Sequence, residues 1–414
     1  MRDGSNRPET SIPIPEFADD AALIEALVDL VRIASVFDLS REDGNERLVA
    51  DYVCRLLDSW DIPYDRWDVA PDRPNIVADI AGGAGPVLVF EGHMDVVTAG
   101  DAGVWARDPF GAEIVDGCMY GRGTADMKGG LAAMLFAAKT IKEAGIDFPG
   151  TLRLAVLSDE EGMMQGARAF AGAGYLADAD AAIICEPEGG RICVAQKGAL
   201  RLSVSFSGSM SHACMPDEGA NPVAALGECI VALKELEADI LSRHEPHPLL
   251  GRFSLSPTVV TGGLAEQANV IPASASLHLD VRTCPEHDHA GIVARIRETC
   301  RLAAATVEGA EADVRLLDDR PATETDAGEA IVQAATVAHR DVFGEIPAIG
   351  GVPGSTDGTI FWMEKQIPLV VWGPGDTTIP HQANEFVRLD EVTGYARAYV
   401  RAAMHYFEAR RASR

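Results

Sequence analysis

Apolar residues follow two different patterns along the first half of the chain, one periodic and one continuous. In residues 22–33 and 45–57 apolar side chains recur every three or four positions, which predicts two amphipathic helices. Short continuous apolar runs at 75–80, 87–91, 152–158 and 181–185 predict buried strands, and the alanine-rich segment 129–144 predicts a helix between them. Strands that alternate with helices indicate an α/β fold with a mainly parallel sheet flanked by helices.

The pattern changes after Gly198. Strand-like segments at 199–207, 254–261, 274–282 and 313–317 enclose helical segments at 220–240 and 289–304. The order strand, helix, strand, strand, helix, strand is that of a ferredoxin-like α+β domain. After Asp318, a helix at 326–343 and a strand at 367–372 return to the first pattern. We therefore expect one domain formed by residues 1–197 and 317–414, with residues 198–316 inserted as a second domain.

Composition and charge narrow the class of protein. A chain of 414 residues is too long for one compact core, which agrees with two domains. Its 35 Lys and Arg residues against 63 Asp and Glu residues give a formal net charge of −28. Such a charge opposes binding to nucleic acids and to anionic membranes, and we expect neither as a partner.

The cysteines and the N-terminal segment bear on location. The eight cysteines include no Cys-x-x-Cys pair, so the sequence indicates neither a thiolate zinc cage nor a redox motif. Residues 1–20 are polar and contain no apolar stretch typical of a signal peptide, and residues 2–10 are expected to form a mobile tail. We expect a cytoplasmic protein with reduced thiols.

Acidic and histidine side chains follow the predicted strands where those strands end. They are His93 and Asp95 after 87–91, Glu160 and Glu161 after 152–158, Glu186 after 181–185, His381 after 367–372, and Asp126 before the predicted helix 129–144. Because ligands bind beyond the carboxyl ends of the strands in open parallel sheets, these side chains should converge at one edge. A carboxylate-rich set with two imidazoles suits two divalent metals and hydrolysis better than redox chemistry or phosphate binding.

The sequence around these residues resembles the M20 metallohydrolase family from about Ala22 onward. The resemblance is carried by Glu91-Gly92-His93-Met94-Asp95, the loop 121–130, Ser158-Asp159-Glu160-Glu161-Gly162 and Cys185-Glu186-Pro187. The family includes acetylornithine deacetylase, succinyl-diaminopimelate desuccinylase, aminoacylase-1 and glutamate carboxypeptidases. It implies a zinc-peptidase-like catalytic domain with an inserted lid and dimerisation domain.

The resemblance also implies a metal ligand set. Asp126 would bridge two divalent ions, with His93 and Glu186 completing one site and Glu161 and His381 the other. Zinc is the expected metal, and cobalt or manganese would also suit these ligands.

Two further acids have implied roles beside the metals. Glu160 would be the general base that takes a proton from the dimetal-activated water, and Asp95 would orient the imidazole of His93. Read alone, adjacent acids such as Glu160 and Glu161 indicate only a solvated helix start.

The inserted domain supplies candidates for substrate binding. By resemblance, His212 would reach the active site of the partner subunit in a homodimer and polarise the substrate carbonyl, while Asn269 and Arg282 would hold the substrate carboxylate. Ser355 and Thr356 match a substrate-contacting loop. The alternative for Arg282 is a salt bridge at the end of a strand.

Four other histidines have a simpler interpretation. His244 and His247 lie in a proline-bearing loop, and His287 and His289 lie at a predicted helix start. They could bind a stray metal, but polar loop composition explains them more simply.

These features predict a metal-dependent amidohydrolase that removes an acyl group from an N-acyl amino acid, of the deacetylase or desuccinylase type. A carboxypeptidase or dipeptidase with the same site is the nearest alternative. Glutamate rather than aspartate at Glu186 favours deacylases and carboxypeptidases over aminopeptidases by family resemblance, without separating the first two. A non-catalytic binding protein that retains the fold is the alternative from another class.

Overall fold

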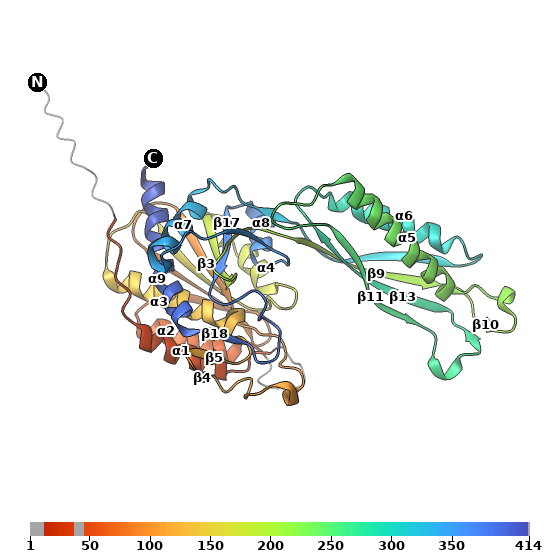
Figure 1. Ribbon diagram of the computed structural model, residues 1–414, viewed down its shortest axis with the longest axis horizontal. Coiled ribbons are helices and arrows are strands. Elements are labelled where there is room, and N and C mark those ends of the chain that lie inside the picture. Colours follow the sequence, from red (N-terminus) through yellow and green to blue (C-terminus); the bar gives the residue numbers. More distant parts are fainter. Residues whose placement is uncertain (1–11, 37–44, 413–414) are drawn as a thin grey trace, which may run out of the picture. The chain divides into compact units, whose positions relative to one another are not determined.

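The computed structural model describes residues 12–36 and 45–412, which form two compact units (Figure 1). The expected mobile tail at residues 2–10 lies outside the described residues. The first unit comprises Met1–Val194, Thr325–Gly350 and Thr356–Arg414, and the second comprises Ala195–Glu324 and Gly351–Ser355. The predicted insertion, 198–316, falls within the second unit, and its role as a lid and dimerisation domain stays a prediction.

A mixed sheet forms the centre of the first unit. Its strands lie in the order β1 (Tyr64–Ala70), β2 (Arg73–Ala81), β6 (Thr151–Leu157), β3 (Val87–His93), β7 (Ala179–Pro187), β17 (Leu369–Gly373), β8 (Ile192–Gln196) and β15 (Thr323–Glu324), and β16 (Ile349–Val352) also pairs with β8. The four central strands β6, β3, β7 and β17 run parallel, as the sequence predicts, whereas β1, β2 and β8 pair antiparallel. The tight turn between β1 and β2 explains one of these pairs, since a connection so short can join only antiparallel strands.

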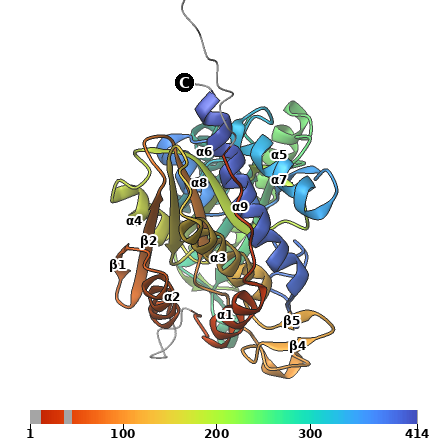
Figure 2. The same ribbon diagram turned by 90° about the vertical axis from the view of Figure 1, so that its left-hand side faces the viewer.

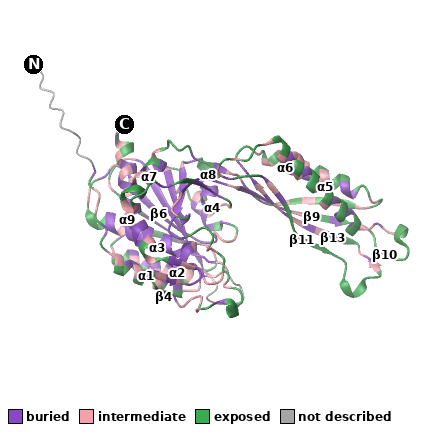
Figure 3. Ribbon diagram, viewed as in Figure 1, coloured by how far each residue is buried: buried purple, intermediate pink, exposed green. Residues whose placement is uncertain are grey.

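Helices cover both faces of this sheet (Figures 1 and 2). On one face lie α3 (Gly129–Ala144), α7 (Ala330–Phe343) and α9 (Leu389–Ala412), and on the other lie α4 (Gln165–Gly172) and α8 (Gly358–Lys365). The central strands and α3 are largely buried (Figure 3). The remaining elements of this unit are α1 (Asp20–Arg32), α2 (Arg47–Ser59), the 3₁₀ turn Ala102–Val104, the short sheet of β4 (Glu113–Val115), β5 (Cys118–Tyr120) and β18 (Phe386–Arg388), and the irregular turn Thr124–Lys128.

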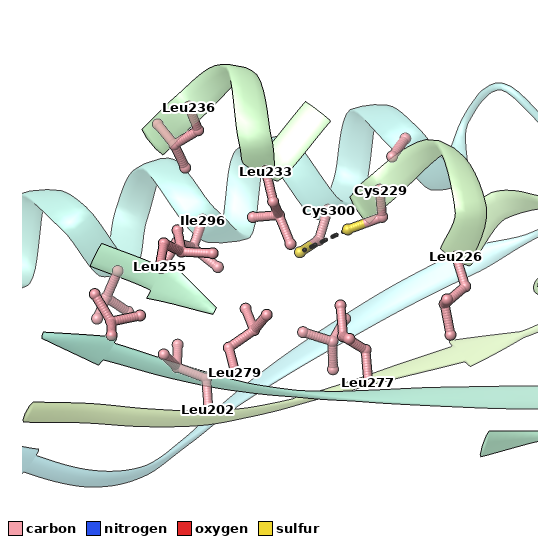
Figure 4. Close-up of a cluster of buried hydrophobic side chains, with 14 of the residues drawn as sticks. Leu202, Leu226, Cys229, Leu233, Leu236, Leu255, Leu277, Leu279, Ile296 and Cys300 are labelled. Carbon is pink, nitrogen blue, oxygen red and sulfur yellow. Dashed lines mark hydrogen bonds between the residues drawn. The ribbon is translucent and has the colours of Figure 1, made fainter. Parts of the chain in front are cut away.

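The second unit has the predicted order of strands and helices. It runs β9 (Gly198–Ser207), α5 (Pro222–Arg243), β11 (Ser254–Gly262), β13 (Ser274–Thr283), α6 (His289–Ala304) and β14 (Glu311–Arg320), with an antiparallel sheet in the order β11-β13-β9-β14. Alternate residues of β13 are buried, because one face of the sheet packs on the helices. Leu202, Leu277 and Leu279 of the sheet point toward Leu233 of α5 and Ile296 of α6 (Figure 4).

Short elements complete the second unit and the passages between the units. They are β10 (Ser211–His212), β12 (Val270–Ile271), the 3₁₀ turns Pro216–Glu218 and Ala265–Gln267, β15 (Thr323–Glu324) and β16 (Ile349–Val352). Among the described residues, no helix combines the length and the apolar character that crossing a bilayer requires.

A glycine allows α3 to approach β7 closely. A Cβ atom on Gly130 would lie 1.9 Å from the carbonyl oxygen of Cys185, the residue before Glu186. A side chain at Gly130 would therefore push the start of α3 away from the end of β7.

We predict that Gly130→Ala destabilises the protein by about 1–3 kcal/mol, the usual cost of overpacking. The matched control is Gly227→Ala in α5, where a Cβ atom would meet nothing within 4 Å. That substitution should stabilise the protein by about 0.5–1 kcal/mol, because alanine loses less backbone entropy in a helix. Chemical denaturation measures both effects, and equal stability of the Gly130→Ala variant and the wild type would contradict the close approach.

Candidate metal centre

The predicted site residues of the first unit meet at the carboxyl edge of its parallel strands. His93 ends β3, Glu186 lies near the end of β7, and Glu160 and Glu161 follow β6. Since β3 runs parallel to both β6 and β7, these strands deliver their final residues to one place. Asp126 and His381 join them from loops.

Asp126 lies between the two imidazoles. Its Oδ1 atom is 3.2 Å from Nε2 of His93, and its Oδ2 atom is 3.3 Å from Nε2 of His381. Nε2 of His93 is also 3.2 Å from Oε1 of Glu186, and Nε2 of His381 is 3.0 Å from Oε1 of Glu161. The five side chains thus form two groups that share one carboxylate, which is the geometry that a bridging ligand requires.

Glu160 belongs to the same cluster. The ligand atoms of His93, Glu160 and Glu186 lie within 4.8 Å of one another, as do those of His93, Asp126 and Glu161. The side chain of His93 is fully buried, whereas that of His381 is 54% exposed. The cluster is therefore open on the side of His381.

Asp95 makes different contacts from those expected. Nδ1 of His93 lies 2.9 Å from the backbone oxygen of Asp95 but 3.7 Å from its carboxylate. The carboxylate instead accepts hydrogen bonds from the backbone N–H groups of Glu160 at 3.1 Å and Glu161 at 3.0 Å. Asp95 thus orients the imidazole through its main chain and positions both glutamates through its side chain.

Glu385, which the sequence does not single out, fixes the loop that carries Asp126 by hydrogen bonds. Its carboxylate accepts hydrogen bonds from the backbone N–H groups of Ala125 at 3.0 Å and Asp126 at 3.2 Å, and it forms a buried ion pair with Arg122. The local sequence around Glu385 does not distinguish it from an exposed acidic residue. Its burial follows only from the folded arrangement of the loop and the segment before β18.

A second buried network supports the segment with the paired glutamates. Arg73 at the start of β2 donates hydrogen bonds to Glu46 and, at 2.6 Å, to Asp159. The backbone N–H of Asp159 in turn donates to Glu46 at 3.1 Å. Asp159 has a φ of +68°, so these contacts hold it in a left-handed conformation directly before Glu160.

The cluster holds more carboxylates than a buried site can keep ionised without a cation. Burial, followed by the charge of Asp126, raises the pKa of Glu186 to about 8. Burial also raises the pKa of Glu160 well above its usual range. Hydrogen bonds to Asp126 and Glu161 raise the pKa of His381 to about 10.

These shifts mean that the cluster favours added positive charge. Divalent ions would supply it. The residues present therefore fit metal ions, and carboxylate with imidazole is a donor set that zinc, cobalt and manganese accept.

The remaining predicted site residues lie elsewhere in the structure. His212, Asn269, Arg282 and Ser355 belong to the second unit, and Thr356 belongs to the first. His212 pairs with Val270 in the ribbon of β10 and β12 and is exposed, as is the neighbouring Asn269. The structure thus brings His212 and Asn269 close together.

Arg282 and Thr356 have partners of their own. Nε of Arg282 donates a hydrogen bond of 2.7 Å to Asp280, so the strand-end salt bridge exists. Thr356 is buried and its hydroxyl accepts a hydrogen bond from the backbone N–H of Gly358 at 3.2 Å. Their roles toward a substrate stay predictions, as do those of His212, Asn269 and Ser355.

Comparison with known proteins identifies relatives over most of the chain. The model of peptidase family M20/M25/M40 matches residues 89–405. A Staphylococcus aureus protein named a probable succinyl-diaminopimelate desuccinylase is 30% identical over 403 residues, which cover 91% of this chain and 97% of that protein.

Solved structures share the fold at lower identity. An M20 family metallo-carboxypeptidase from Sulfolobus solfataricus has a TM-score of 0.76 at 17% identity, covering 94% of this chain and 99% of that one. A Bacillus subtilis protein described as a dinuclear metal-binding peptidase of family M20 has a TM-score of 0.68 at 20% identity, covering 92% and 98%.

We predict that Asp95→Asn weakens zinc binding by about 10–100-fold, the usual effect of losing a group that positions a metal ligand. The amide would turn its N–H₂ group toward one of the two backbone N–H groups that the carboxylate now accepts. Competition with a chromophoric chelator measures the affinity. Asp147→Asn, at an exposed position, is the control and should bind zinc like the wild type. The same affinity in the Asp95→Asn variant would show that Asp95 does not position the ligands.

Proposed function

This chain belongs to peptidase family M20/M25/M40 and is a hydrolase of amide bonds, and from that premise we propose that it removes an acyl group from an N-acyl amino acid. The products are a carboxylate and a free amino acid. The convergence of two imidazoles and the carboxylates on Asp126, with Glu160 in the same cluster, carries the proposal. The desuccinylase named among the relatives supports an acyl group such as succinyl.

The proposal includes two divalent metal ions, with zinc as the native metal. Asp126 would bridge them, His93 and Glu186 would hold one, and Glu161 and His381 would hold the other. Such ions polarise the scissile carbonyl and lower the pKa of the attacking water.

Glu160 would move the proton in this reaction. It would accept a proton from the attacking water and later deliver it to the nitrogen of the leaving amine, which makes the amine a stable product. Two observations support this role. Burial raises the pKa of Glu160 and so favours its holding a proton between the two steps, and Asp95 fixes its backbone beside the ligand Glu161.

The second unit would complete the site in a homodimer. We assign carbonyl polarisation to His212 and recognition of the substrate carboxylate to Asn269 and Arg282, with Ser355 and Thr356 in contact with the substrate. Strand β11 lies at the edge of its sheet, with β13 on one side, and this edge supports dimerisation, since an exposed edge is a template for pairing with a second copy. Strand β11 exposes Val259 and Val260, whose exposed fractions are 49% and 55%.

We place the protein in the cytoplasm. All eight cysteines in the described residues are free, which suits a reducing compartment.

A carboxypeptidase or dipeptidase with the same centre is the nearest alternative, and the metallo-carboxypeptidase among the structural neighbours gives it weight. All of these reactions break an amide bond. A deacylase releases one amino acid and a carboxylic acid, a dipeptidase releases two amino acids, and a carboxypeptidase releases one amino acid and a shortened peptide. The products therefore distinguish them.

We predict that chelation abolishes hydrolysis and that zinc, cobalt or manganese restores it. On a panel of N-succinyl amino acids, N-acetyl amino acids and dipeptides, at least one N-acyl amino acid should have the highest kcat/KM. Higher values for dipeptides would favour the peptidase. Hydrolysis that survives complete metal removal would refute a metal-dependent reaction, and the absence of turnover on any substrate by the metal-loaded protein would favour a binding protein.

Glu160→Gln and Glu161→Gln form a matched pair that separates proton transfer from metal binding. Glu160→Gln should lower kcat by about 10²–10⁴-fold, because a positioned base is lost, and should keep its metal content. Glu161→Gln should lose metal, because a ligand is removed. Rates with metal content measured on the same samples test both. Near wild-type kcat in the Glu160→Gln variant would exclude Glu160 as the base.

A further inference from the structure

The second unit contains another group of metal-binding side chains, apart from the candidate metal centre. His244 follows α5 directly, and Glu286 and His287 lie in the turn between β13 and α6. The ligand atoms of these three residues lie within 4.8 Å of one another. The fold thus brings together two segments that are distant in the sequence, which loop composition alone could not indicate.

The ring of His287 is fixed in place. Its side chain is only 3% exposed, and it stacks on Phe253 with ring centroids 5.2 Å apart. The ring of His244 lies against it, with the centroids 4.7 Å apart. The backbone N–H of Cys284 donates a hydrogen bond to Nδ1 of His287 at 3.1 Å, and the backbone oxygen of Cys284 lies 3.2 Å from the same nitrogen. Oε1 of Glu286 lies 3.8 Å from Nδ1.

The other ring nitrogen of His287 has no partner. Nε2 is buried and makes no hydrogen bond within the part of the chain that the structure describes. Leaving a buried polar atom unpaired is costly, so the site favours a ligand that would satisfy it. In the tautomer whose Nδ1–H donates to the backbone oxygen of Cys284, Nε2 presents its lone pair, which is how proteins orient metal-binding histidines. A bound ion would select this tautomer.

The neighbouring histidines are already engaged. Nδ1 of His247 accepts hydrogen bonds from the backbone N–H groups of Leu249 and Leu250. The ring of His289 bonds to Thr283 at 2.7 Å and to Asp319 at 2.6 Å. Neither ring is a member of the cluster.

We propose that His244, Glu286 and His287 bind a divalent transition-metal ion of the zinc class, separate from the ions of the catalytic centre. Two imidazoles and one carboxylate leave a fourth position for water, which suits zinc. His287 provides the fixed ligand, while the half-buried His244 and the exposed Glu286 can adjust to close on the ion. The ion would tie the end of α5 to the turn before α6. This inference does not depend on the proposed function.

Metal counting on the full-length protein tests the site. The apoprotein is dialysed against zinc and the bound metal per chain is measured by inductively coupled plasma mass spectrometry. His287→Ala should bind one zinc ion fewer than the wild type, with unchanged kcat/KM for the best substrate. His278→Ala, on β13 and outside the cluster, should match the wild type in both measurements. Equal zinc content in His287→Ala and the wild type would overturn the proposal.

Two further variants keep the result interpretable. If His287→Ala does not fold, the half-buried His244→Ala replaces it and should show the same loss of one ion, and equal counts there would again overturn the proposal. In an Asp126→Ala background, which removes the bridging ligand of the catalytic centre, adding His287→Ala should still remove one zinc ion. That difference in zinc content is independent of whether the enzyme hydrolyses any substrate. If adding His287→Ala removes no zinc ion in this background, the ion does not bind at His287 and the proposal fails.

Discussion

Electrostatic repulsion among buried carboxylates is the constraint on which the first unit depends. Glu160, Glu161, Glu186 and Asp126 share one small volume with two imidazoles, and burial raises the pKa of all three glutamates. Such a group is unfavourable unless cations neutralise it. The fold therefore has to hold the acids together against their repulsion, and the surrounding hydrogen bonds stabilise this arrangement.

Key hydrogen bonds of this kind run from the backbone to Asp95 and Glu385, two acids outside the proposed ligand set. Asp95 accepts the N–H groups of Glu160 and Glu161, and Glu385 accepts that of Asp126. Each supporting acid fixes the backbone of a segment rather than a single side chain. The parallel strands set the coarse position of the ligands, and these contacts set their orientation.

The sequence predicts well what depends on local pattern. Continuous apolar runs locate β3, β6 and β7, and the resemblance to the family singles out the candidate ligands that follow them, which the fold brings together. The sequence predicts less well the features that depend on contacts between distant segments. Glu385 looks like any acid of a loop, and the carboxylate of Asp95 faces the glutamates rather than His93, because the end of β6 lies beside it in the fold. The antiparallel strands β1 and β8 and the long helix α9 were not predicted, and the pairing of His244 with His287 arises only when α5 and α6 pack on one sheet.

The central claim is that the carboxylate cluster holds two metal ions bridged by Asp126. Anomalous diffraction at the zinc absorption edge, from crystals of the zinc-loaded protein, tests it most directly. The account predicts two anomalous peaks on opposite sides of Asp126, one beside His93 and Glu186 and the other beside His381 and Glu161. A zinc-loaded crystal without a peak at this cluster, or with a single peak that Asp126 does not contact, would contradict it.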